Sequence, residues 1–477
     1  MAQEATVNTP VPQFDKMEPK YSLADHLTGG TREFREQGEL YLPREKGETA
    51  NCYENRLNRT VLFGAWKKTV RKLSAMPFTK PATMVEPDQD RDPREARLDV
   101  SVDRKSTTVD QFARKLTRSF LRKGGAHFMV DMPPLVEGRT QAERDEQDIR
   151  PYFAILDPSN IIGWEHRFNR ITQRNELVSL RVRDTRMEKD KDNPFKTVCV
   201  KRVRHYEPGK TTIWIKNDDE WKVEREFETT FPGIPLVSTD YQADEPFMPT
   251  LPLDDLAMLN VEHYQSTADQ RNILHVARIP LLYGAGFEEG SLKTDDMGVG
   301  QFFTNTDPNA KLSYVEINRG GAIEAGARDI ESIEARMSMM GLEMLVKKEN
   351  ETATRAMINM KEQTCELQDI VVLVENMVHE GYKVAGQYLE QNWDTKWIFF
   401  KEFGIDARQH EDLTTLLSAR GQNEISRETW LKELSRRSVV EELDVDAEMA
   451  RLAAEEREEL NRLSLTQPTQ TPTGNNN

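Results

Sequence analysis

The sequence lacks the compact motifs that identify the common enzyme classes. It contains no Gly-x-x-x-x-Gly-Lys-Ser/Thr loop to bind nucleotide phosphates, no His-Glu-x-x-His pair to bind zinc and no Gly-x-Ser-x-Gly turn to present a serine nucleophile. Gly284, Gly286 and Gly290 have the wrong spacing for a dinucleotide-binding fingerprint. We therefore predict that the chain has no catalytic residues, binds no cofactor and is not an enzyme.

Cysteines and long apolar runs are also scarce. Cys52, Cys199 and Cys365 are odd in number and far apart, which favours idle thiols in a reducing compartment over a disulfide framework. No apolar run approaches the roughly 18 residues that a membrane helix needs, so we expect no membrane partner. Residues 1–20 contain acidic side chains and prolines but no apolar core, and they predict a flexible arm instead of a signal peptide.

Positive charge is in deficit. The chain carries 81 Asp and Glu against 65 Lys and Arg, and its net charge of −16 disfavours a conventional nucleic-acid binder, whose phosphate contacts need cations. Between Leu253 and Gly341, 14 acidic residues outnumber 7 basic ones. Such a balance occurs in ordinary cytosolic proteins and also in surfaces that must repel phosphate. Charge alone leaves both interpretations open.

One acidic cluster has the spacing of a metal site. Glu86, Asp88, Asp90 and Asp92 recur every second residue, and carboxylates so placed can bind Mg²⁺ or Ca²⁺. The same segment is interrupted by proline and arginine and has no lysine nearby, which is typical of a solvated surface loop. We interpret residues 86–97 as such a loop and predict no metal site.

The sequence does contain a change from helical to strand-like patterns. Apolar residues at helical spacing predict mostly helical structure over 21–81, with one stripe from Leu57 to Leu73, and a further helix over 109–121. Alternation and turn residues then predict a β-rich region over 151–237. Helices followed by an antiparallel sheet give the fold class α+β. The predicted strands are 127–133, 151–156, 177–182, 198–206, 211–216 and 221–227.

The segment from 253 to 393 has the most distinctive order of elements. A helix to Ala277 is followed by a turn-rich, strand-like insert, a second helix, a short charged loop and one very long helix. One apolar face of the second helix consists of Ile323, Ala327, Ile330, Met337 and Met340. Beyond the long helix we expect a strand at 396–403, helices at 411–420, 428–436 (with Ser426 as N-cap) and 446–463, and disorder in the polar tail.

Short sequence motifs accompany this order of elements from the first helices to the C-terminal region. They are Tyr41-Leu42-Pro43, Gly47-Glu48, Arg56-Leu57-Asn58-Arg59, Phe78 to Pro81, Leu121 to Gly125, Val130 to Pro133, Arg150-Pro151-Tyr152, Pro158 to Trp164 and Gly421 to Thr429. In this order they make the chain resemble the portal proteins of tailed bacteriophages.

The resemblance implies an α+β portal architecture with a wing, a two-helix stem, a small α/β clip, a tunnel loop, a long helix and a helical crown. The implied divisions are a flexible arm (1–20), the wing (21–252), stem helix 1 (253–277), the clip (278–319), stem helix 2 (320–341), the tunnel loop (342–354), the long helix and returning wing strand (355–404), the crown (405–463) and a disordered tail (464–477).

A portal of this kind is a structural subunit of a ring at one capsid vertex, expected to be a dodecamer. It would conduct double-stranded DNA without sequence preference during packaging and ejection. The partners implied are the terminase large subunit, the head–tail adaptor, and the major capsid and scaffold proteins. We therefore expect assembly in the host cytoplasm and a final place in the virion.

The resemblance also assigns residues to these roles. The DNA-facing tunnel loop would contain Lys347, Lys348, Glu349, Asn350, Glu351 and Thr352. Partner docking at the clip would involve Phe287, Glu288, Glu289, Asp295, Asp296 and Phe302.

Two other classes of protein compete with this interpretation. Another virion structural protein is possible, although a scaffold would be mostly helical and would lack the strands between 151 and 237. A virion-associated nuclease is disfavoured because the catalytic motifs are missing.

Overall fold

The chain forms two compact units, Met1–Phe403 and Gly404–Asn477, and each is described by itself. Their structure is a computed structural model. It describes residues 5–85, 91–133, 149–190, 193, 195–217, 220–229, 231–278, 281–286, 309–315, 320–343, 365–401, 417–422, 425–427, 429–431, 448–455 and 457.

The first unit begins with a helix where the sequence predicts a flexible arm. Helix α1 (Pro12–Gly29) buries Phe14, Met17 and Tyr21, which recur every three or four residues and so share one face. The backbone N–H of Val11 also donates to the carbonyl of Ile162, at 2.9 Å. The prediction of a flexible arm over 1–20 is therefore wrong for residues 11–20, because their apolar side chains at helical spacing fill a core.

The predicted stripe from Leu57 to Leu73 is divided between two helices. Helix α3 (Ala50–Arg59) ends at Thr60, which has extended backbone angles, and α4 (Ala65–Leu73) begins after Gly64. The guanidinium of Arg35, in the last turn of α2 (Thr31–Glu36), donates twice to the Thr60 carbonyl, at 2.8 and 3.1 Å. The Thr60 carbonyl therefore bonds a side chain at the point where the helix ends. The spacing of apolar residues cannot reveal such an interaction.

Residues 93–97 are helical, which corrects the predicted surface loop there. Helix α5 (Pro93–Val100) has Pro93 in its first turn, and the Asp92 carboxylate caps it by accepting from the Arg94 N–H at 2.7 Å. Glu95 is buried and accepts a hydrogen bond from Thr395. Asp92 is thus a helix cap, and the other three carboxylates of the candidate metal cluster lie outside the described residues.

Helix α6 (Val109–Lys123) confirms its prediction and has well-defined ends. Thr108 and Gln111 form a capping box at its start. Gly124 ends it with a φ of 73°, a left-handed conformation that favours glycine. The chain then enters the first sheet directly.

Two antiparallel sheets follow, and the predicted strands are confirmed. The three-stranded sheet has the order β3-β2-β9, and the five-stranded sheet has the order β4-β5-β6-β7-β8. Strands β4 and β9 were not predicted from the sequence, since each combines a short apolar start with polar residues. The bounds are β2 (Gly125–Asp131), β3 (Tyr152–Leu156), β4 (Ile161–Asn169), β5 (Arg174–Lys189), β6 (Thr197–Glu207), β7 (Lys210–Asn217), β8 (Glu220–Glu228) and β9 (Leu236–Asp240).

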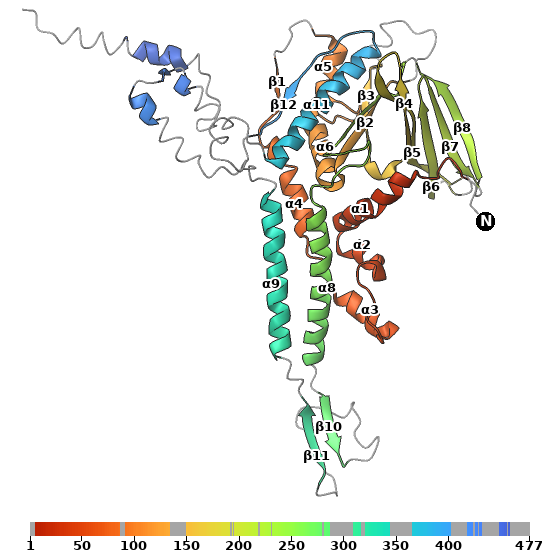
Figure 1. Ribbon diagram of the computed structural model, residues 1–477, viewed down its shortest axis with the longest axis vertical. Coiled ribbons are helices and arrows are strands. Elements are labelled where there is room, and N and C mark those ends of the chain that lie inside the picture. The colour runs from red at the N-terminus through yellow and green to blue at the C-terminus, as the bar shows by residue number, and fades with distance from the viewer. Residues whose placement is uncertain are drawn as a thin grey trace, which may run out of the picture. The chain divides into compact units, whose positions relative to one another are not determined.

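The main core lies between the three-stranded sheet and two helices, α6 and α11 (Glu366–Gln387). Phe112, Phe128 and Phe153 meet there with ring centroids 5.1 to 5.5 Å apart. A Cβ on Gly381 of α11 would approach the Phe128 ring to 2.9 Å, so glycine permits this close helix–sheet contact. Figure 1 shows α11 and α6 beside β2.

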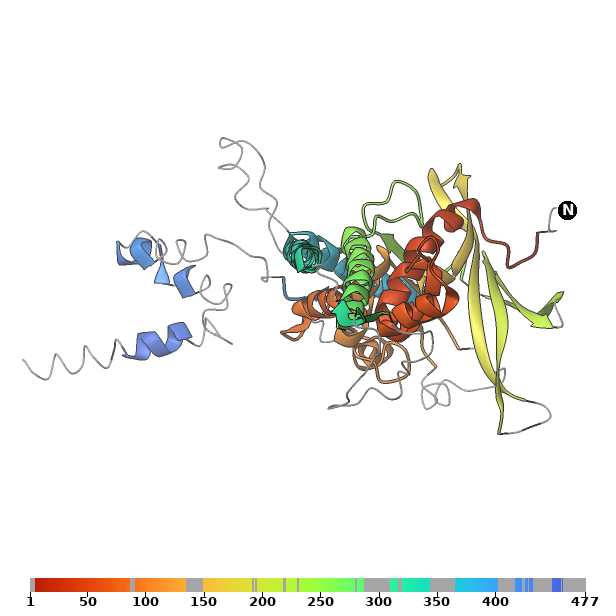
Figure 2. The same ribbon diagram turned by 90° about the horizontal axis from the view of Figure 1, so that it is seen from below.

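Helix α11 is shorter at its end than predicted, because it stops at Gln387 and the chain turns before Trp393. The returning strand is also short: β12 (Trp397–Ile398) pairs with β1 (Thr83–Met84). The first unit is therefore α+β, and Figure 2 shows the five-stranded sheet next to α1 from below. Among the described residues, no helix has both the length and the apolar character to cross a membrane.

The second unit is described only in part. The Ser426 side chain accepts from the backbone N–H of Thr429 at 3.1 Å, which confirms Ser426 as a helix N-cap. Residues 448–455 are helical, and Arg451 pairs with Glu448 at 3.4 Å.

Candidate functional site: the α8–α9 helix pair

Helix α8 (Asp254–Ala277) is anchored along only part of its length. Its 24 residues correspond to about 36 Å. Asp254 and Asp255 lie in its first turn, where their negative charge stabilises the positive end of the helix dipole. Leu256 and Tyr264 are almost fully buried, whereas the last turn, from His275 to Ala277, is exposed. The helix therefore begins inside the protein core and ends in solvent.

A buried amide fixes the root of α8. Asn260, 1% exposed, donates through Nδ2 to the carbonyl of Phe63 at 2.8 Å and accepts from the Trp66 N–H at 3.1 Å. Phe63 lies between α3 and α4, and Trp66 lies in the first turn of α4, where backbone N–H groups have no partner within the helix. Asn260 bonds both groups and holds α8 against α4.

A buried guanidinium makes the second anchor. Arg56, 4% exposed, pairs with Glu48 at 2.9 Å and with Asp269 of α8 at 3.3 Å, and donates to the Pro43 carbonyl at 2.8 Å. Its hydrogen bond lowers the pKa of Glu48 below the usual range. Arg56 belongs to a motif that carried the family resemblance, but its contact with Asp269 could not be predicted from sequence patterns.

Helix α9 (Gly320–Glu343) contacts α8 through one seam. The residues on this seam alternate three- and four-residue spacings, as antiparallel helix pairs require. Ile333 and Met337 are buried within it. Ala327, predicted to lie on this face, is exposed; Gly326 and Ile333 occupy it instead. The seam consists of Ile323, Gly326, Ile330, Ile333, Met337 and Met340.

Polar contacts fix the register of the pair. Positions rise along α8 as they fall along α9, so the helices are antiparallel, and Figure 1 shows them side by side. The contacts are Gln270 Nε2 to the Ile323 carbonyl (2.8 Å), His263 Nε2 with Glu334 Oε1 (3.0 Å) and Arg336 with Glu262 (3.2 Å).

Gly326 allows the closest approach of the two helices. A Cβ built at this position would meet the Gln270 Oε1 at 2.2 Å. Any larger residue would have to displace the Gln270 amide, which bonds the first turns of α9. Small size at position 326 is therefore part of the pair's geometry.

The exposed surface of the pair is acidic. The two helices carry nine Asp and Glu against three Arg. Glu324 is 66% exposed and pairs with Arg328, and Glu262 is 49% exposed and pairs with Arg336. Met258 and Met339 are also largely exposed, which leaves apolar area available to another surface.

A β-hairpin joins the free ends of the pair. Strand β10 (Leu281–Ala285) pairs with β11 (Lys311–Val315), Leu281 opposite Val315 and Ala285 opposite Lys311. Only a few residues separate β10 from α8 and β11 from α9, so the hairpin must lie near these helix ends. The predicted strand-like insert is thus present (Figure 1).

The residues predicted to act here are not placed. Lys347, Lys348, Glu349, Asn350, Glu351 and Thr352 lie outside the described residues, and so do Phe287, Glu288, Glu289, Asp295, Asp296 and Phe302. Their roles stay predictions. In the described part of the chain, no group of three or more His, Cys, Asp or Glu is arranged to hold a metal ion.

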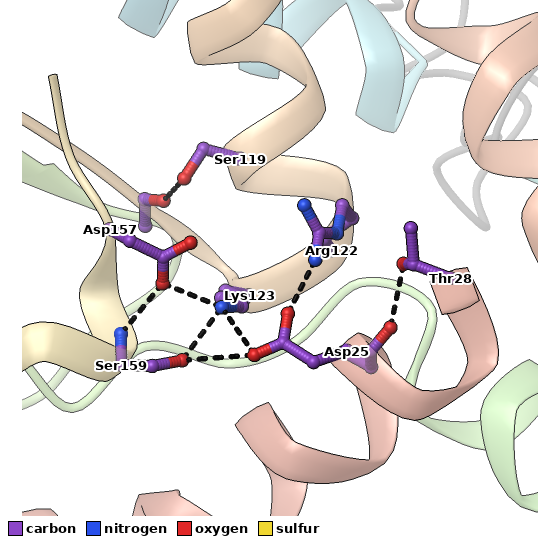
Figure 3. Close-up of polar contacts among 9 residues, drawn as sticks. Asp25, Thr28, Ser119, Arg122, Lys123, Asp157 and Ser159 are labelled. Carbon is purple, nitrogen blue, oxygen red and sulfur yellow. Dashed lines mark hydrogen bonds and ion pairs between the residues drawn. The ribbon is translucent and has the colours of Figure 1, made fainter. Parts of the chain in front are cut away.

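A buried lysine ties α1 to the start of the sheets. The Lys123 ammonium, 2% exposed, lies 2.9 Å from Asp25, 2.5 Å from Asp157 and 2.6 Å from the Ser159 hydroxyl (Figure 3). All three donors are used. Burial favours neutral Asp157, but the Lys123 charge outweighs it and lowers the pKa of Asp157. This centre is structural, since nothing in it is left to react.

A second buried pair lies on neighbouring strands of the same sheet. Burial lowers the pKa of His127 to about 3 and raises the pKa of Asp240 to about 6. His127 Nε2 and Asp240 Oδ1 are 3.7 Å apart, beyond a hydrogen bond, while Asp240 Oδ2 accepts from the Phe247 N–H at 2.8 Å. Burial disfavours the charged form of both groups, so the stability of the fold depends on pH through this pair.

Comparison with known proteins finds a family model that matches part of the chain and several similar solved structures. Residues 252–389 match a family model described as "Domain of unknown function (DUF4055)". This range begins just before α8 and ends just after α11. No curated protein sequence matches the chain.

Three solved structures contain chains similar to this one at 10% identity. In "Virion of native gene transfer agent (GTA) particle" the TM-score is 0.37, over 76% of this chain and 88% of that chain. In "Neck of native GTA particle computed with C12 symmetry" it is 0.40, over 78% and 90%. In "Neck of empty GTA particle computed with C6 symmetry" it is 0.40, over 76% and 87%.

Proposed function

We propose that the chain is the subunit of a portal ring, a channel that conducts double-stranded DNA at one capsid vertex. The observation that carries this proposal is the α8–α9 pair: two antiparallel 24-residue helices, anchored at one end and closed by a hairpin at the other. The sequence motifs that resemble portals support it independently.

The second face of α9 favours assembly into a ring. Opposite the seam with α8, exposed residues recur at spacings of seven, four, three and four, and three of the five are small. A helix with two opposite packing seams can contact α8 of its own chain and a helix of the next copy. Repetition of one such heterologous contact closes a ring if the rotation permits. The residues are Gly321, Arg328, Ser332, Ala335 and Met339.

The acidic surface of the pair fits the bore of such a ring. Nine carboxylates against three guanidiniums per copy would repel the DNA phosphates at short range. DNA would pass without being held, which a conducting channel needs. A basic bore would instead bind it tightly.

The remaining roles follow from the same assignment. The hairpin end would dock the terminase large subunit and later the head–tail adaptor, while the wing would meet capsid and scaffold proteins. The chain would act in the virion as a structural protein and not as an enzyme.

Negative-stain microscopy of the purified chain tests the proposal. We expect rings with a central hole, and Ala335→Arg on the second seam should abolish them. Ala96→Arg, an equal change on the exposed face of α5, should leave the rings intact. A chain that stays monomeric at high concentration, or rings that survive Ala335→Arg as well as Ala96→Arg, would contradict this assignment.

A further inference from the structure

The five-stranded sheet carries a hollow far from the helix pair in sequence. Its volume is about 520 Å³, and most of its charged lining residues are cations, although the whole chain has a net charge of −16. The lining residues are Asn8, Asn160, Arg183, Asp184, Thr185, Lys201, Arg202, Lys216 and Trp221.

Four of these residues form one row across four strands. Thr185 lies opposite Lys201, and Lys216 lies opposite Trp221. The next pair along, Arg202 with Ile215, fixes Lys201 and Lys216 as neighbours in the same row. This row therefore places two ammonium groups side by side on one face of the sheet. Lys201 makes no ion pair within the described residues.

The one acidic lining residue, Asp184, belongs to the row of Arg202 and Lys222, whose side chains extend from the opposite face of the sheet to Lys201. Asp184 Oδ2 accepts from Arg202 at 2.5 Å and from Arg204 at 2.9 Å, and its Oδ1 accepts from the Thr185 N–H at 2.9 Å. Burial alone would raise the pKa of Asp184, but the two guanidiniums lower it, so the group stays ionised and paired. It therefore offers little repulsion to an incoming anion.

The N-terminal segment forms one wall and is fixed by arginines. Arg181 donates to the carbonyls of Val7 and Thr9, at 3.0 and 2.7 Å, and Arg183 Nε donates to Asn8 Oδ1 at 3.1 Å. The hollow is thus formed in advance by the fold. Its other lining side chains supply hydrogen-bond donors from amide, hydroxyl and ammonium groups.

We propose that this hollow binds one nucleotide unit of a nucleic-acid strand, with the phosphate between Arg183 and Lys201 and the base against Trp221. A phosphate oxyanion matches a lining of donors and cations. The volume exceeds that of a phosphate, and an indole at the rim offers a stacking face that a carboxylate peptide does not need. Phosphate contacts and stacking together imply binding without sequence preference.

Fluorescence polarisation of a labelled single-stranded oligonucleotide on the full chain tests this. Lys201→Ala should weaken binding about tenfold at low salt. It should also reduce the slope of the logarithm of the binding constant against the logarithm of the salt concentration by about one, the loss of one phosphate contact. Lys222→Ala is the matched control, since Lys222 pairs with Ile215 and so extends from the opposite face of the sheet. Trp221→Leu should weaken the oligonucleotide about tenfold and leave inorganic phosphate binding unchanged.

Competition with inorganic phosphate and with poly-glutamate separates the possible ligands. Displacement by phosphate but not by poly-glutamate supports the nucleotide site. Equal losses with Lys201→Ala and Lys222→Ala would show diffuse charge attraction and overturn it. If poly-glutamate binds tightly and its affinity is unchanged in Trp221→Leu, the hollow would instead be a docking site for an acidic protein. Absence of any binding at low salt would also overturn the proposal. None of these outcomes depends on whether the chain forms rings.

Discussion

Single buried polar side chains, charged or neutral, join distant segments of this fold. Lys123, Arg56 and Asn260 each satisfy several polar groups from distant segments, and each lies almost entirely out of solvent. Such groups contribute little when complete but cost much when one partner is removed. Substitution of one of these residues should therefore produce a clear loss in the free energy of unfolding.

Lys123→Met should lower the free energy of unfolding by about 3 kcal/mol, because Asp25 and Asp157 would lose their shared cation. Both carboxylates keep some solvent access, which limits the loss. Lys16→Met, on the exposed side of α1, should change stability by less than about 0.5 kcal/mol. Urea denaturation followed by circular dichroism would compare them, and equal losses would mean that the Lys123 centre is not stabilising.

Asp240→Asn should stabilise the protein at neutral pH. The folded pKa of about 6 lies above the ordinary 3.8, so the folded state binds the extra proton between these values. The stability that Asp240 contributes is present at low pH and is lost as pH rises through 6. At pH 7 the ionised, buried carboxylate costs about 2 kcal/mol, and asparagine avoids this while still accepting from the Phe247 N–H.

His127 gives the opposite slope, which makes the test specific. Its folded pKa of about 3 lies below 6.5, so its stability is lost as pH falls below 6.5. In the unsubstituted chain the two slopes partly cancel between pH 4 and 6. Asp240→Asn should reveal the His127 slope in denaturation curves at pH 4, 5.5 and 7. A variant no more stable than the parent at pH 7 would rule out a buried, ionised Asp240.

At the scale of elements, the α8–α9 pair is defined by what holds its root. Apolar spacing makes each helix and its seam, but the attachment to α3 and α4 depends on Asn260 and Arg56. Apolar packing therefore forms the helix pair, whereas buried polar contacts attach the pair to the rest of the unit. The attachment consists of a few polar contacts in a buried place.

Asn260→Ala should cost about 2 kcal/mol of unfolding free energy, since the Phe63 carbonyl and the Trp66 N–H would be left buried without partners. Asn376→Ala on the exposed side of α11 is the matched control and should be nearly neutral. Hydrogen exchange would locate the effect: we expect faster exchange at the start of α4 and not in the five-stranded sheet. Uniform loss of protection would argue against a local anchor.

At the scale of the whole molecule, the proposed function depends on copies that the single chain does not contain. In the proposed ring, the exposed second seam would form the subunit contact, the acidic surface would line the bore and the hairpin would dock partners. Assembly therefore decides how the surfaces of one chain are used.

The tunnel-loop lysines provide a test at this scale. If Lys347 and Lys348 form a cationic belt in an otherwise acidic bore, the double change to alanine should leave ring assembly intact but alter DNA retention. The effect should be larger at low salt, because the Debye length falls to about 8 Å at physiological ionic strength. Retention of packaged DNA measured at two salt concentrations would check this. Loss of rings in the double variant would place these lysines in a subunit contact.

The sequence by itself determined the elements that local pattern encodes. Helix α6, strands β3 and β5 to β8, and the helix–hairpin–helix order follow from periodicity and turn residues. The family resemblance also rested on short stretches of sequence.

Only the tertiary structure decided which distant groups meet. The break before α4, the burial of α1, the Asn260 anchor and the cationic row at Lys201 each join segments far apart in the chain. Sequence patterns report the period of one segment and carry no information about the segment that packs against it. Polar contacts of this kind have no period, so they appear only when the chain is folded.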